Sequence, residues 1–67
     1  MNTIYDIRQL LKKFGTFIYI GDRIADLELM ETEIKELYQS QLIDINDYQM
    51  ARMLLRKEIA IEKQNRE

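Results

Sequence analysis

The chain has no histidine, cysteine, proline, tryptophan or valine and only two glycines. Without histidine and cysteine there is no imidazole base, no thiol nucleophile and no Cys/His zinc site. Ser40 is the single serine, so a Ser-His-Asp catalytic system cannot form. We therefore expect that the protein is not an enzyme and that it uses no cofactor and no metal. The lack of cysteine is compatible with a reducing compartment, and we expect a cytoplasmic protein.

Long apolar runs are also missing. No run approaches the ~18 residues that a membrane span needs, so no membrane contact is expected. The first residues lack the basic region and apolar stretch of a signal peptide. Isoleucine, leucine and phenylalanine still supply 20 of the 67 residues. That share is above the roughly 20% below which chains tend to be disordered. We expect one small domain over residues 1–67, with a core worth about 3–5 kcal/mol.

The apolar residues recur at helical spacing in three segments. Thr3 with Asp6 three residues later is a variant of the capping box, and Asp22 and Asp44 are suitable N-caps for the other two segments. Gly15 supplies the left-handed residue that commonly ends a helix. Three helices are predicted, at about residues 4–14, 23–40 and 45–63.

Residues 15–21, Gly-Thr-Phe-Ile-Tyr-Ile-Gly, have a different pattern. Bulky β-formers between two glycines are locally typical of a strand. The chain offers no second strand, and a lone strand leaves its backbone groups without partners. We interpret the segment as an extended connector whose apolar residues close one end of the bundle. Its pairing with a second copy in a dimer is the other interpretation. The predicted fold class is all-α, a small three-helix bundle with an extended apolar connector between helices 1 and 2.

The net charge of −2 is unevenly distributed. Three bases against one acid give residues 1–21 a net +2, two bases against six acids give residues 22–43 a net −4, and residues 44–67 balance at five of each. Nucleic-acid-binding domains usually have a pI above about 9, so the total argues against that class. The positive first segment argues for it, because its charge is concentrated on one helix.

An aromatic and basic surface is predicted on the first helix, on the face opposite its apolar stripe, and just beyond the following turn. Aromatic rings that stack on bases, beside cations that follow phosphates, are what binding of single-stranded nucleic acid requires. The alternative is an ordinary solvated helix face. The candidate residues are Tyr5, Arg8, Lys12, Lys13, Tyr19 and Arg23.

A second candidate surface is apolar, because the third helix is apolar over more than half its circumference. Such a helix contacts two neighbours in its own bundle, or one neighbour and another chain. Methionine adapts to irregular partners and is frequent at interaction surfaces. This surface predicts a homodimer or a contact with another protein. Its candidate residues are Leu29, Met50, Met53, Leu54 and Ile61.

The chain resembles the YqgQ-like family of small bacterial proteins over nearly its whole length. The resemblance lies in Gln9–Gly15, Ile18–Arg23, Asp26–Met30, Glu36–Tyr38, Leu42–Ile43, Ala51 and Leu54–Glu58. It implies a cytosolic three-helix bundle that binds single-stranded nucleic acid as a regulator, and it supplies no catalytic residues. The leading hypothesis is accordingly a non-catalytic nucleic-acid-binding protein. The alternative is a protein-interaction or dimerisation module that uses the apolar face of the third helix.

Overall fold

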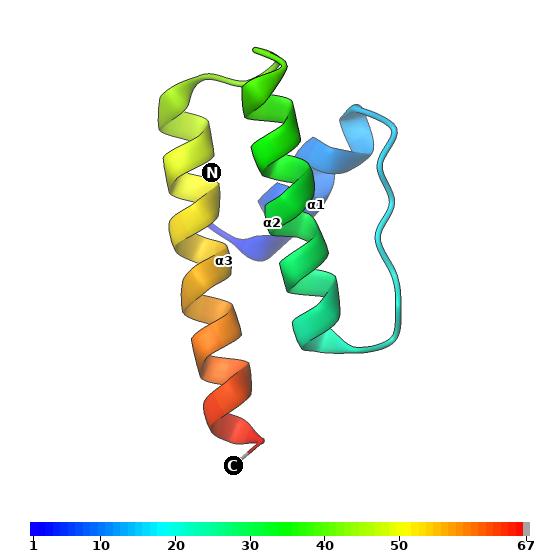
Figure 1. The fold of residues 1–67 in the computed structure, drawn as a ribbon, viewed down its shortest axis with the longest axis vertical. Helices are drawn as coiled ribbons and strands as arrows, with labels where there is room; N and C mark the ends of the chain where they lie inside the picture. Colours follow the sequence, from blue (N-terminus) through cyan, green and yellow to red (C-terminus); the bar gives the residue numbers. More distant parts are fainter. Residues whose placement is uncertain (67) are drawn as a thin grey trace.

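A computed structural model describes residues 1–66, which form three helices (Figure 1). These are α1 (Ile4–Lys13), α2 (Arg23–Gln39) and α3 (Ile45–Asn65). No strand occurs within residues 1–66. The predicted all-α three-helix fold is therefore confirmed, and the predicted helix ends differ from the observed ones by at most two residues.

Short polar side chains determine where each helix begins. The Thr3 hydroxyl accepts the Asp6 backbone N–H at 3.2 Å, and the Asp6 carboxylate accepts the Thr3 N–H at 3.1 Å. Asp22 accepts the N–H groups of the first turn of α2, and Asp44 accepts the Asp47 N–H at 2.8 Å. These bonds satisfy backbone donors that would otherwise lack partners at a helix start.

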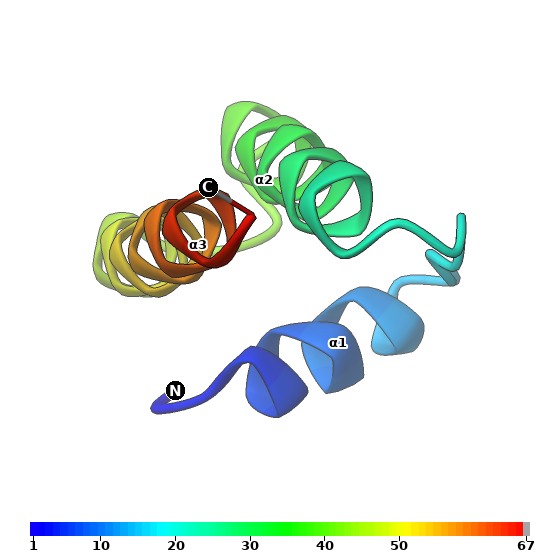
Figure 2. The same cartoon turned by 90° about the horizontal axis from the view of Figure 1, so that it is seen from below.

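The helices α2 and α3 lie side by side and antiparallel (Figure 1), and α1 crosses one face of that pair (Figure 2). Each helix contributes its apolar stripe to the space between them. The fully buried side chains are those of Ile7, Leu11, Leu27, Met30, Ile34, Ala51 and Leu55. The core is small, as expected for a domain of this size, which buries a smaller fraction of its surface than a larger domain does.

The connector between α1 and α2 runs along the side of the molecule next to α2 (Figure 1). Gly15 and Gly21 bound it, with φ values of 84° and 94°. Of its apolar residues Ile18 packs against the core, whereas Phe17 and Tyr19 are 82% and 79% exposed. The expectation that the apolar residues of the connector pack against the bundle therefore holds for Ile18 and was wrong for Phe17, Tyr19 and the 55% exposed Ile20. Successive side chains of an extended segment point to opposite sides, so Phe17 and Tyr19 point outward when Ile18 points inward.

The turn between α2 and α3 is held by aromatic stacking. The rings of Tyr38 and Tyr48 lie 4.5 Å apart between centroids and are parallel to within 3°. Gln41 in this turn has a φ of 62°, a conformation that glycine adopts more readily. Across the described residues no helix has the length and apolar character needed to cross a membrane.

Candidate nucleic-acid interface

Arg8 and Asp26 join α1, the connector and α2. Asp26 is only 5% exposed, and its Oδ1 accepts the Ile20 N–H at 2.8 Å. Its Oδ2 lies 3.8 Å from Nη2 of Arg8. The Nη1 of Arg8 donates to the Ile18 carbonyl at 2.9 Å. The connector backbone is thus held at two points by a pair of opposite charges.

Three of the predicted nucleic-acid residues meet at one place. Tyr5, Arg8 and Lys12 line a hollow of about 130 Å³ between the outer face of α1 and the connector. Thr16, Phe17 and Ile18 form the connector side of this hollow, and the buried Leu11 and Met30 also line it. Tyr5 remains 66% exposed, so its ring is accessible for stacking. We call this hollow, together with Tyr5, Lys12 and Phe17, the α1–connector surface.

The other predicted residues lie apart from the hollow. Tyr19 is exposed further along the connector, and Lys13 is exposed at the end of α1. Arg23 faces α3, where it lies 3.8 Å from a Glu58 oxygen and 3.9 Å from a Glu62 oxygen. Arg23 and Arg8 therefore already have acidic partners, whereas Lys12 and Lys13 form no ion pair with any residue from 1 to 66.

Phe17 is an exposed aromatic residue that the sequence reasoning did not select. Its spacing of two from Tyr19, within a segment of β-formers, was the available signal, because that spacing places both rings on one side of an extended chain. Because the apolar residues of the connector were expected to face the bundle, Phe17 was not included in the candidate surface.

Two carboxylates at helix starts, those of Asp6 and Asp22, have lowered pKa values. The Asn2 backbone N–H, together with the backbone and hydroxyl groups of Thr3, holds the pKa of Asp6 below its ordinary value. The Arg66 guanidinium donates to Asp22 at 2.7 Å and lowers the pKa of that carboxyl. Both groups therefore stay ionised at the helix starts, where negative charge is favoured.

The residues of the predicted protein interface also fall into two groups, of which only one lines a common hollow. Met50, Met53 and Leu54 line a hollow of about 230 Å³ on α3 together with Lys57. Met53 is 70% exposed, while Leu54 is partly buried against the core. Leu29 is 40% exposed on α2. Leu29 and Ile61 do not line this hollow.

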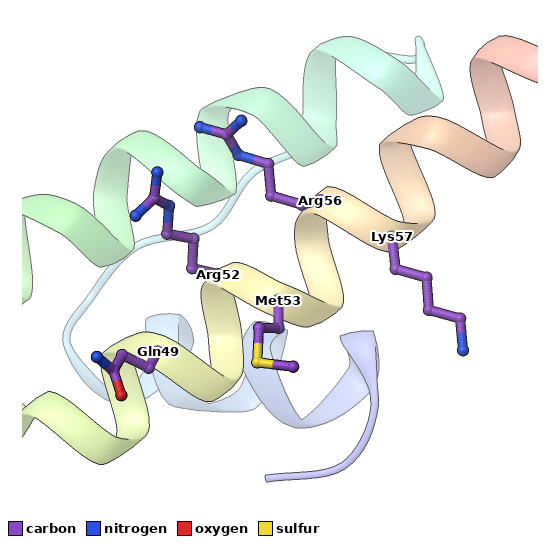
Figure 3. A pocket seen from close by; sticks show the side chains of 5 residues that line it. All are labelled: Gln49, Arg52, Met53, Arg56 and Lys57. Carbon is purple, nitrogen blue, oxygen red and sulfur yellow. The ribbon is translucent and has the colours of Figure 1, made fainter.

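A basic stripe on α3 was not predicted as a site. It surrounds Met53 and lines an open hollow of about 610 Å³, formed by Gln49, Arg52, Met53, Arg56 and Lys57 (Figure 3). In Figure 3 the arginine side chains reach toward α2, and Met53 and Lys57 point away from it. Arg56 donates to both Glu31 oxygens from Nε, at 3.0 and 3.1 Å. All five lining residues belong to one helix, so this is an open helix face. The spacing of four between Arg52 and Arg56 was its signal in the sequence.

Comparison with known proteins gives two matches. The family model described as YqgQ-like matches residues 1–61. A protein of Bacillus subtilis (strain 168), named "Uncharacterized protein YqgQ", is 45% identical over 67 residues. That match covers 100% of this chain and 94% of the relative.

Proposed function

We propose that this chain, which belongs to the YqgQ-like family, is a small non-catalytic cytoplasmic protein. It binds single-stranded nucleic acid weakly. The observation that carries this proposal is the α1–connector surface, where one hollow is lined by two exposed aromatic residues and by Lys12, which forms no ion pair with residues 1–66. A second exposed ring on the connector, that of Tyr19, extends the surface. The chemistry of such a surface suits a flexible strand whose bases are free to stack.

Stacking is the first contribution to this binding. Tyr5 is 66% exposed and Phe17 82%, so both of these residues that line the hollow are largely open to solvent. Base–aromatic stacking contributes about 1–3 kcal/mol per base and tolerates any sequence. The hollow of about 130 Å³ is smaller than the roughly 300 Å³ at which pockets for enclosed small molecules begin. A base laid on an open surface fits it better than an enclosed ligand.

Phosphate contacts are the second contribution. Lys12 and Lys13 have no acidic partner among residues 1–66, while Arg8 and Arg23 are engaged with carboxylates. Two neutralised phosphates on a single strand predict that log K falls with log salt at a slope of about −1.4. If Arg8 and Arg23 left their partners to bind phosphate as well, the slope would be about −2.8.

Fluorescence anisotropy with labelled oligonucleotides at two or more salt concentrations tests the proposal. We expect binding at tens of micromolar protein in low salt and the shallower of the two slopes. Tyr5→Ala should reduce affinity at least fivefold, and Lys12→Gln should reduce both the affinity and the slope. Lys35→Gln is the matched control, because it removes the same charge from an exposed position on α2. Absence of binding in low salt, or equal effects of Lys12→Gln and Lys35→Gln, would overturn the proposal.

A protein contact through α3 is the second candidate, and the 70% exposure of Met53 favours it. If the apolar face of α3 holds two copies together, Leu54→Glu should convert a dimer to a monomer in light scattering. Because Leu54 is partly buried, Met53→Glu provides a second variant that leaves the core intact. A protein that is monomeric before and after both changes excludes self-association through this face.

A further inference from the structure

One edge of the connector backbone is bound to the bundle at two points, and the other edge is open. Arg8 binds the Ile18 carbonyl and Asp26 binds the Ile20 N–H. In an extended chain those two groups point to the same side, and the N–H and C=O groups of Phe17 and Tyr19 point to the other. Among residues 1–66, the backbone groups of Phe17 and Tyr19 have no hydrogen-bond partner. The connector also lies at the outside of the molecule in both views (Figures 1 and 2).

This open edge lacks the usual protections against pairing. Natural edge strands are blunted by charges, by proline, or by a covering loop or helix. Residues 14–21 contain no charged residue and no proline. They also present exposed apolar side chains, with Phe17 and Tyr19 about four-fifths exposed and Ile20 55% exposed. Aromatic and β-branched residues are the ones that favour a strand.

The segment is close to symmetric about Ile18. If two copies lie antiparallel with Ile18 facing Ile18, each Gly15 faces a Gly21 and each Phe17 faces a Tyr19. In that register the inward-facing edges stay bound to Arg8 and Asp26 of their own chains. The edges that meet are those of Phe17 and Tyr19, so each facing pair exchanges both of its backbone hydrogen bonds. The open groups of one copy are thus matched by those of the other.

We propose that the connector is a self-association edge, which pairs antiparallel with the connector of a second copy across a two-fold axis at Ile18. The symmetric register and the absence of repelling charge select a second copy over an unrelated partner. The ribbon is short, so the dimer is weak and reversible. This inference does not rest on the proposed nucleic-acid function. Side chains stand perpendicular to a ribbon, so pairing leaves the rings of Phe17 and Tyr19 accessible.

Cysteine cross-linking tests the register, since the natural chain has no cysteine. Phe17→Cys and Tyr19→Cys variants are mixed in equal amounts and oxidised. Facing residues of a hydrogen-bonded antiparallel pair have Cα atoms about 5.5 Å apart, a distance that a disulfide spans. We expect the mixed disulfide to exceed clearly the statistical half of the products. Met53→Cys mixed with Tyr19→Cys is the control and should give no such enrichment. Statistical proportions in the first mixture would overturn the register.

Variants with like or opposite charges at positions 17 and 19 test the association itself. Their mass is measured by sedimentation or light scattering over a concentration series. The average mass of the natural protein should rise with concentration from 8.1 kDa toward twice that value. Phe17→Lys/Tyr19→Lys and Phe17→Glu/Tyr19→Glu should each remain monomeric, and their mixture should dimerise at least as well as the natural chain. A natural chain that is monomeric throughout would refute the proposal. So would a dimer that persists in the lysine variant and is lost in Met53→Glu, because its interface would lie on α3.

Discussion

Replacement of Asp26 by alanine should destabilise the protein severely, because this carboxylate holds the connector against the bundle. It is 5% exposed and accepts the Ile20 N–H at 2.8 Å. A hydrogen bond to a charged group contributes about 1.5–3 kcal/mol. The contact with Arg8 at 3.8 Å adds at most about 1 kcal/mol, because the Arg8 side chain is 33% exposed. The expected loss is about 2–4 kcal/mol, from a domain whose total stability is about 3–5 kcal/mol.

Urea unfolding followed by far-ultraviolet circular dichroism measures this loss. Asp26→Asn keeps an oxygen that can accept the Ile20 N–H and loses the charge, so its expected cost is smaller, about 1–2 kcal/mol. Glu36→Ala is the control, because Glu36 is exposed on the same helix and its change should stay within about 0.5 kcal/mol. The reasoning would be refuted if Asp26→Ala were as stable as Glu36→Ala. Amide exchange at Ile20 gives a local check, since its protection should be lost in Asp26→Ala.

Three further outcomes can be tested by equilibrium unfolding. Because Arg66 lowers the pKa of Asp22, the folded state keeps this carboxylate ionised to lower pH than the unfolded chain does. The resulting stabilisation is present above the unfolded value of about 3.9 and is lost in stronger acid, so natural protein and Arg66→Gln should differ at neutral pH and converge below both pKa values. Gln41→Gly should raise stability by up to about 1 kcal/mol, because a φ of 62° strains a side-chain-bearing residue by more than glycine loses in entropy; an unchanged melting temperature would contradict this. A double-mutant cycle of Tyr38→Ala and Tyr48→Ala should show a coupling of about 0.5–1.5 kcal/mol from their stacking, and additive effects would count against it.

The helices could be predicted because their signals are local. The sequence predicts Thr3, Asp22 and Asp44 as N-caps, and each of them caps its predicted helix in the structure. The buried residues of each helix, such as Leu27, Met30 and Ile34 of α2, also lie at the helical spacing from which the helices were predicted. Caps and stripes depend on residues at most a few positions apart, so they need no knowledge of the tertiary arrangement.

The partners of charged residues could not be predicted in this way. Asp26 belongs to an acidic segment and resembles a solvated side chain in sequence. It is buried because the connector folds back and brings the Ile20 N–H to it. Arg23 meets Glu58 and Glu62, which lie 35 and 39 positions later in the chain. Only the antiparallel packing of α2 and α3 determines that contact.

The candidate site was partly predictable for the same reason. Tyr5, Arg8 and Lys12 share one face of α1 because of their spacings of three and four, and the structure brings them to one hollow. Phe17 joins them through the course of the connector, which no helical periodicity describes. The structure therefore adds Thr16 and Phe17 to the predicted face of α1, and it leaves Tyr19 and Arg23 outside the hollow.

A nuclear magnetic resonance titration with a short unstructured oligonucleotide tests most directly whether the α1–connector surface binds nucleic acid. Amide shifts report every part of the chain in one measurement, so the site is located and detected together. We predict that the largest changes occur around Tyr5, Lys12, Lys13, Phe17 and Tyr19. Shifts confined to the α3 stripe from Gln49 to Lys57, or no shifts in low salt, would contradict the account.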